Sequence, residues 1–141
     1  MIFYSDASFS HTRKVAGIAC VAVDGNEVVN LITKKVTALD PIDAELKGIY
    51  ENIRFAKRTA KKGEAITLFS DCALAVNMIG NPGRTPARYY EIVADIIKIK
   101  GDLKIEWGRR CGNGQADALA NLALRHNIEG LVTSVEPTFS I

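Results

Sequence analysis

Four acidic residues stand at points of the sequence where carboxylates can gather around a cation. Asp6 follows the short apolar segment 2–5, and Asp71 follows a similar segment at 65–70. Glu45 and Asp117 each lie near the start of a segment with helical spacing. A single acid at such a position is also an ordinary turn former or helix cap. Together the four offer hard oxygen ligands that suit Mg²⁺ or Mn²⁺, and such a cation offsets the repulsion between close carboxylates.

Apolar patterning and turn signals predict the strands that carry two of these acids. The predicted strands cover residues 2–5, 15–23, 27–34, 65–70 and 103–107. The first is expected to stop at Asp6, and Asp24-Gly25-Asn26 is expected to turn the second strand into the third. Trp107 ends the last of these strands and is expected to belong to the core. Segment 131–135 fits either a short strand or coil.

A long amphipathic helix is the clearest helical prediction. Its apolar residues recur at spacings of 4, 3, 4, 3 and 4, which traces one buried stripe: Ile42, Leu46, Ile49, Ile53, Ala56 and Ala60. Asp40 can cap this helix, Pro41 suits its first turn and Gly63 can stop it. Shorter helices are predicted over 73–79, 87–100 and 113–126.

The order of these elements predicts an α/β fold with a mixed sheet and helices packed on its faces. Helical crossovers imply that the strands 2–5, 65–70 and 103–107 run parallel to one another. Sites in such sheets form at the carboxyl ends of parallel strands, where Asp6 and Asp71 both stand. We expect a single domain over residues 1–141, with a tail at 128–141 whose structure the sequence leaves open.

The composition of the chain excludes several classes of protein. With 48% hydrophobic and 24% charged residues the chain is not a disordered one, and its longest apolar run is too short to span a membrane. The beginning of the chain has no pattern of a secretory signal. Three scattered cysteines, Cys20, Cys72 and Cys111, predict neither disulfides nor a zinc site and favour a reducing, cytoplasmic location. The net charge of +2 is too small to indicate nucleic-acid binding by itself.

The acid motifs, taken in order, resemble those of the ribonuclease H family, type 1. The resemblance rests on Tyr-Ser-Asp6-Ala-Ser, Asp-Ala-Glu45-Leu, Phe-Ser-Asp71-Cys, and Trp107 followed by Asn113-Gly-Gln-Ala-Asp117-Ala-Leu-Ala. It implies a ribonuclease H-like fold with a five-stranded sheet whose first three strands form an antiparallel meander. It also implies that Asp6, Glu45, Asp71 and Asp117 bind two divalent ions, Mg²⁺ or Mn²⁺, with Asp6 bridging both.

The activity implied by this resemblance is endonucleolytic hydrolysis of the RNA strand of an RNA–DNA hybrid, leaving 5′-phosphate ends. Neither a membrane nor an obligate protein partner is expected. Residues expected to contact the nucleic acid are Ser8, Arg84, Arg88, Arg109, Arg110 and Asn113. Arg110 stands in the loop where many family members carry a histidine, and its spacing resembles a branch with arginine there. It is therefore expected to hold a phosphate near the reacting bond.

Two departures from the family pattern leave alternatives open. Where the family usually places Asn or Gln before the helix glutamate, this chain has Pro41-Ile42-Asp43-Ala44, and Ala7 follows Asp6 where glycine is common. A nuclease of the same fold that acts on DNA or single strands is therefore one alternative. A catalytically silent nucleic-acid-binding domain is another, although the presence of all four acids counts against it. The basic residues within 51–62 are either a solvated helix face or further phosphate contacts.

Overall fold

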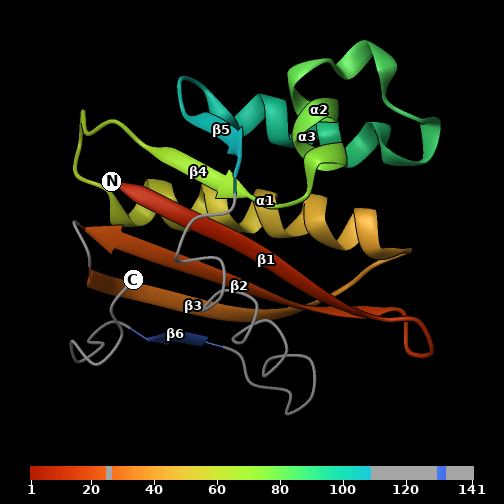
Figure 1. The fold of residues 1–141 in the computed structure, drawn as a ribbon, viewed down its shortest axis with the longest axis horizontal. Helices are drawn as coiled ribbons and strands as arrows, with labels where there is room; N and C mark the ends of the chain where they lie inside the picture. Colours follow the sequence, from red (N-terminus) through yellow and green to blue (C-terminus); the bar gives the residue numbers. More distant parts are fainter. Residues whose placement is uncertain (25–26, 109–129, 133–141) are drawn as a thin grey trace.

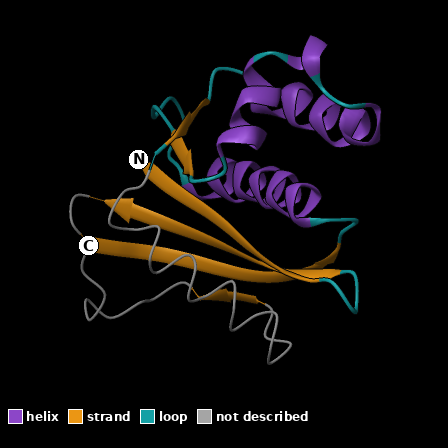
Figure 2. Ribbon diagram, turned by 45° about the vertical axis from the view of Figure 1, so that its right-hand side comes forward, coloured by secondary structure: helices purple, strands orange, loops and turns teal. Residues whose placement is uncertain are grey.

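The computed structural model describes residues 1–24, 27–108 and 130–132, which form a mixed β-sheet with helices on one face (Figures 1 and 2). The strands are β1 (Ile2–Ser10), β2 (Val15–Asp24), β3 (Glu27–Thr37), β4 (Thr67–Ser70), β5 (Lys104–Trp107) and β6 (Gly130–Val132). The helices are α1 (Pro41–Thr59), α2 (Ala73–Gly80) and α3 (Tyr90–Lys100), with 3₁₀ turns η1 (Pro82–Arg84) and η2 (Ala87–Tyr89).

The order of the strands across the sheet confirms the predicted α/β topology. The order is β5-β4-β1-β2-β3-β6. β1, β2 and β3 form the antiparallel meander, whereas β4 is parallel to β1 and β5 is parallel to β4. A sixth strand, β6, extends the five expected strands by pairing antiparallel with β3 (Figure 1). It lies in the tail whose structure the sequence left open.

Strand β1 continues beyond Asp6, so the prediction that it stops there is wrong. Residues 8–10 remain paired with residues 15–17 of β2, and the turn occupies only residues 11–14. Lys14 completes that turn with a φ of 54°. The polar side chains of this stretch suggested a loop, but backbone pairing with β2 sets the end of the strand. Asp6 consequently lies inside the sheet, paired with Ala19 and buried.

Helix α1 begins where the sequence predicts. Asp40 is its N-cap and accepts a hydrogen bond through Oδ1 from Asp43 N at 2.8 Å. Asp43 in turn accepts through Oδ2 from Leu39 N at 2.8 Å, so the two acids cap the helix reciprocally. The helix ends at Thr59, before the predicted stop at Gly63, which has a φ of 79° in the following turn.

The apolar stripe of α1 packs on one face of the sheet and forms the main core. Its fully buried members include Leu46, Ile49 and Ile53. Phe3 of β1 meets Phe55 of α1 edge to face, with ring centroids 5.7 Å apart. Alternation along β1 turns Tyr4 to the opposite face. The cluster there consists of Tyr4, Ala19, Val21, Val23, Leu31 and Phe69.

The end of β5 differs from the prediction for Trp107. That side chain is 58% exposed and therefore does not belong to the core. β5 is the edge strand beside β4, and two other side chains of β5, Lys104 and Glu106, are exposed as well. The predicted helix over 87–100 begins as the turn η2, and the predicted helix over 113–126 lies outside the described residues. None of the helices in the described part combines the length and the apolar character that a membrane span requires.

The cap of α1 makes a testable contribution to stability. Asp40 Oδ2 also accepts a hydrogen bond from the hydroxyl of Tyr89, a buried residue, at 2.7 Å. Asp40→Ala should lower the free energy of unfolding by about 1–3 kcal/mol, because it removes the cap and leaves the Tyr89 hydroxyl without this acceptor. Tyr89→Phe leaves the cap intact and should therefore lower the free energy of unfolding by less. Urea titrations of both variants measure the two losses.

The stabilisation by Asp40 should depend on pH. Partial burial acts to raise the pKa of the Asp40 carboxyl, but hydrogen bonds from Asp43 N and the Tyr89 hydroxyl, with the charge of Arg88, hold the pKa below its ordinary value. A carboxyl with a lowered folded-state pKa stabilises the fold above its unfolded pKa of about 4 and loses that effect as pH falls through the folded pKa. The difference between wild type and Asp40→Ala should therefore shrink at about pH 2–3. An unchanged difference there would contradict this account.

Candidate metal centre

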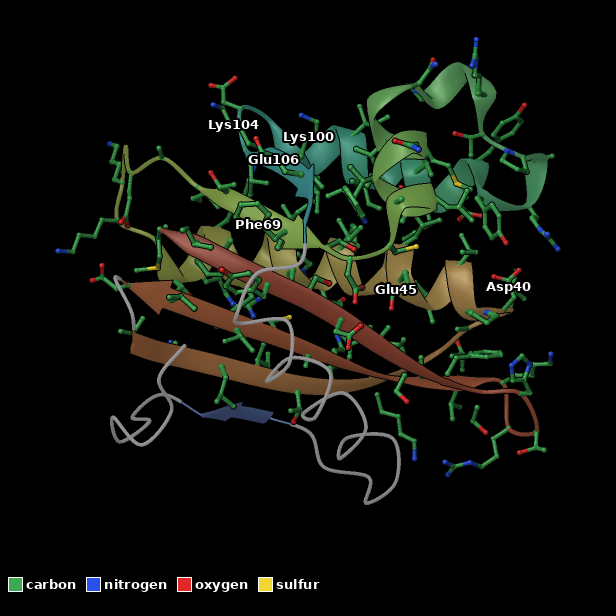
Figure 3. The ribbon with its side chains drawn as sticks, in the orientation of Figure 1. Asp40, Glu45, Phe69, Lys100, Lys104 and Glu106 are labelled. Carbon is green, nitrogen blue, oxygen red and sulfur yellow. The ribbon has the colours of Figure 1, made fainter. Side chains whose placement is uncertain are left out.

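Asp6, Glu45 and Asp71 come together where α1 packs on β1, beside the end of β4. Asp6 lies in β1, and Asp71 directly follows β4, whose Ser70 pairs with Ser5 of β1. Because the two strands are parallel neighbours, their acids meet on adjacent strands, as the sequence predicted. Glu45 comes from the second turn of α1 (Figure 3). One carboxylate oxygen from each residue lies within 4.8 Å of the others.

Close packing of α1 on β1 places Glu45. Its Oε1 accepts a hydrogen bond from Ala7 N, the residue after Asp6, at 3.0 Å. One turn further along α1, Gly48 faces the same strand. A Cβ atom at this position would lie 3.2 Å from Ser5 Oγ, which is tighter than ordinary contact. The absence of a side chain at Gly48 therefore lets the helix approach closely enough for Glu45 to reach the strand.

Hydrogen bonds hold the backbone around Asp71, where β4 ends. Two of them come from the end of β5, and one lies within the chain just after β4. Gly108 N donates to Ser70 O at 3.1 Å, which continues the pairing of β5 with β4. The indole nitrogen of Trp107 donates to the Asp71 carbonyl oxygen at 3.2 Å. Cys72 N donates to Ser70 Oγ at 3.2 Å. These contacts fix the point at which β4 ends and α2 begins.

The site is negative and partly withdrawn from water. Asp6 is only 6% exposed, and Asp6 Oδ2 and Glu45 Oε2 are buried atoms. Burial raises the pKa of the neighbouring Cys72 thiol, and the charges of Glu45 and Asp71 raise it further. Cys72 is thus a neutral thiol at neutral pH. Three carboxylates with oxygens this close form a donor set that fits a hard divalent cation such as Mg²⁺ or Mn²⁺.

The remaining residues predicted for the site are only partly described. Asp117, Arg109, Arg110 and Asn113 lie outside the described residues. Ser8 is half-buried in β1, two residues beyond Asp6, and pairs with Gly17.

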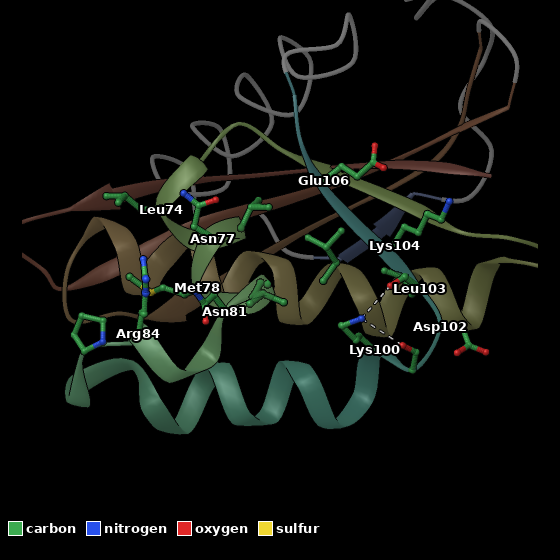
Figure 4. Close-up of a pocket in the computed structure, with 16 residues that line it drawn as sticks. Leu74, Asn77, Met78, Asn81, Arg84, Lys100, Asp102, Leu103, Lys104 and Glu106 are labelled. Atoms are coloured by element: carbon green, nitrogen blue, oxygen red, sulfur yellow. Dashed lines mark hydrogen bonds between the residues drawn. The ribbon is translucent and has the colours of Figure 1, made fainter.

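Arg84 and Arg88 lie on the turns between α2 and α3. Arg88 is 3.7 Å from Asp40 Oδ2 and stacks on the ring of Tyr89, so it contacts the cap of α1. Arg84 lines a cavity of about 930 Å³ between α2, the end of α3 and β5 (Figure 4). Apolar residues such as Leu74 and Leu103 line much of it, and none of the three carboxylates does. No described contact brings either arginine to the carboxylates.

Sequence reasoning missed the residues that support the acids. Gly48 has no signal in a helical pattern beyond an isolated glycine, which usually only weakens a helix. The prediction that Trp107 belongs to the core rests on its place at the end of a strand. The polar residues Lys104 and Glu106 in the same short strand were the available signal that this is a sheet edge.

Comparison with known proteins agrees with this fold. The family model described as "Reverse transcriptase-like" matches residues 4–123. Comparison with curated proteins found no match.

Solved structures of several ribonucleases H share the fold. LC11 ribonuclease H1, solved in complex with an RNA/DNA hybrid, has a TM-score of 0.77 at 21% identity, covering 89% of this chain and 97% of that one. Ribonuclease H1 of the halophilic archaeon Halobacterium salinarum has a TM-score of 0.72 at 21% identity with the same coverage. The N-terminal ribonuclease H domain of a Mycobacterium tuberculosis protein has a TM-score of 0.71 at 18% identity, covering 89% and 93%. With the ribonuclease H-like fold and a family model that matches most of its length, the chain belongs to the reverse transcriptase-like family.

Proposed function

We propose that the protein is a metal-dependent endonuclease that hydrolyses the RNA strand of RNA–DNA hybrids and leaves 5′-phosphate ends. The observation that carries the proposal is the convergence of Asp6, Glu45 and Asp71 within 4.8 Å on a ribonuclease H-like fold. The LC11 ribonuclease H1 complex, whose fold this chain shares, supports a hybrid as the substrate class.

In this proposal the acids act by holding cations rather than by attacking the substrate. By the family pattern Asp6 would contact both ions, with Glu45, Asp71 and Asp117 completing the ligand set. These carboxylates would hold two divalent ions, Mg²⁺ or Mn²⁺, which would supply Lewis-acid chemistry for hydrolysis of the phosphodiester. The hydrogen bond from Ala7 N would keep the Glu45 carboxylate oriented beside Asp6.

Cleavage of labelled substrates tests this proposal. The full chain is incubated with an RNA–DNA hybrid, duplex DNA, duplex RNA and single strands, each with Mg²⁺, with Mn²⁺ or with a chelator. We expect metal-dependent cleavage of the RNA strand in the hybrid, with 5′-phosphate ends. Binding without cleavage in any metal would instead identify a silent nucleic-acid-binding domain.

One structural observation favours the second candidate, a nuclease of the same fold that acts on DNA or on single strands. The residues before Glu45 offer no polar reader of a ribose hydroxyl. Asp43 is 3% exposed and its carboxylate is engaged by Leu39 N and Lys47 Nζ, while Ala44 is 1% exposed. Pro41 and Ile42 carry no side-chain donor or acceptor.

We therefore predict weak discrimination between the hybrid and other duplexes. A site built to hydrogen-bond a substrate hydroxyl rejects the analogue without it by about 10⁴-fold or more, whereas a site without such groups discriminates by about 10²-fold or less. Ratios of kcat/KM for hybrid and duplex DNA measure this directly. Strict hybrid preference that survives substitution of residues 8–14, Ser8 included, would contradict the prediction.

We also propose a reducing, cytoplasmic setting for this activity. Both described cysteines, Cys20 and Cys72, are free thiols. Burial raises the pKa of Cys20 well above its ordinary value, so this thiol resists oxidation.

A further inference from the structure

Trp107 is an exposed tryptophan that is nevertheless held in place. Large aromatic side chains stabilise a fold mainly by leaving water, yet this one is 58% exposed. Burial therefore does not account for a tryptophan at the end of a sheet edge. Its described polar contact is the hydrogen bond from the indole nitrogen to the carbonyl oxygen of Asp71, at 3.2 Å.

We propose that Trp107 is a positioning residue for Asp71, and that its indole N–H fixes the backbone from which the Asp71 side chain projects. This inference rests on the proposed function, because it assigns Trp107 to the same metal centre.

The geometry of the strand end explains how a contact with a carbonyl reaches a carboxylate. Gly108 N holds the Ser70 carbonyl before Asp71, and Trp107 holds the carbonyl of Asp71 itself. With the peptides on both sides constrained, the φ and ψ of Asp71 are constrained, and so is its Cα–Cβ bond. Mg²⁺ demands near-ideal octahedral geometry, so a ligand that swings by even half an ångström weakens binding.

A competing role for the exposed ring is stacking on nucleic acid. Stacking needs the aromatic face but not the N–H group, whereas positioning needs the N–H group. Trp107→Phe keeps a ring and removes the donor, and Trp107→Leu removes both. Tyr90→Leu is a matched control, because Tyr90 is 57% exposed on α3 and contacts none of the three acids by any described hydrogen bond or ion pair.

The primary measurement is Mn²⁺ binding to each full-length variant without nucleic acid, with free Mn²⁺ counted by electron paramagnetic resonance. We expect Trp107→Phe and Trp107→Leu to weaken Mn²⁺ affinity about three- to tenfold, the scale of one lost hydrogen bond, and Tyr90→Leu to leave it unchanged. In cleavage assays kcat of Trp107→Phe should fall at limiting Mn²⁺ and recover in excess, with KM for the hybrid unchanged.

Tryptophan fluorescence of the wild-type protein supplies an independent measurement of Mn²⁺ binding. Trp107 is the only tryptophan in the chain, so its fluorescence reports this position alone. Its emission should change over the same range of Mn²⁺ concentration as binding, and Asp71→Asn should abolish that change.

The possible failures are distinguishable. Wild-type Mn²⁺ affinity in Trp107→Phe would overturn the positioning role, and a rise in KM confined to Trp107→Leu would then identify stacking as the role of the ring. A lower urea midpoint of Trp107→Phe with normal Mn²⁺ binding would show that Trp107 only stabilises the fold, and this result would also overturn the positioning role. If Asp71→Asn binds Mn²⁺ as wild type does, the metal centre itself is wrong. If that variant loses Mn²⁺ while Trp107→Phe does not, only the role of Trp107 fails.

Discussion

Asp6→Asn should reduce hydrolysis by about a thousandfold or more while the fold stays intact. Asp6 is buried inside β1 and shares the cluster with Glu45 and Asp71, and the proposed function makes it the ligand of both ions. An amide of the same shape keeps the packing but removes the charge that binds the cation. If Asp6 holds the catalytic ions, the substitution would remove stabilisation of charge that develops in the transition state, so the loss should appear in kcat.

The same substitution should make the metal-free protein more stable. Three carboxylate oxygens within 4.8 Å repel one another, and Asn removes one of the charges. We expect a gain of about 1 kcal/mol, or roughly 2–4 °C in Tm, measured with a chelator present. Added Mg²⁺ should raise the Tm of wild type and not that of Asp6→Asn, since only a protein that binds the ion gains from it.

Asp95→Asn provides the control, because Asp95 is an exposed acid on α3 and its loss changes the net charge equally. This variant should keep wild-type turnover and the response of Tm to Mg²⁺. Near-normal turnover in Asp6→Asn would rule out a mechanism in which these carboxylates hold the metal.

The sequence predicted those parts of the fold in which local signals agree with tertiary packing. For α1, the apolar stripe, the Asp40 cap and Pro41 all predict the same helix, and the structure confirms it. The meeting of Asp6 with Asp71 also followed from the predicted parallel pairing of their strands, because Ser5 pairs with Ser70 and each acid is the next residue, although β1 itself continues past Asp6.

The predictions failed where a contact distant in sequence overrides the local pattern. β1 passes Asp6 because residues 15–17 supply partners for residues 8–10, and nothing in Ser8-Phe9-Ser10 itself shows that pairing. Trp107 is exposed because β5 is an edge strand, which depends on the order of the whole sheet. The role of Gly48 depends on how closely α1 approaches Ser5, a distance that no spacing of residues encodes.

Arg110→Ala should lower turnover by roughly ten- to a thousandfold. Arg110 lies outside the described residues, so this expectation rests on its place in the sequence, three residues after Trp107. A guanidinium that holds a phosphate beside the reacting bond would offset the developing negative charge.

A positive charge alone at position 110 should restore only part of the activity. Arg110→Lys keeps the positive charge but loses the planar fork that binds two phosphate oxygens, so we expect partial recovery relative to Arg110→Ala. Arg54→Ala is the matched control, since Arg54 is an exposed arginine on α1 that pairs with Glu51 at 3.5 Å. Equal turnover in wild type and Arg110→Ala would show that Arg110 makes no contact with the reacting phosphate.

The pH dependence of turnover distinguishes an arginine from a histidine in this role. Arginine stays protonated at any ordinary pH, so it holds a phosphate without donating a proton near neutrality. His11, one of two histidines in the chain, lies in the turn after β1 and packs against Phe9 rather than against the acids. We therefore expect no single ionisation near pH ~6.5 to control kcat. If such an ionisation appeared and vanished in His11→Ala, proton transfer would belong to the turn after β1 and not to the loop that follows Trp107.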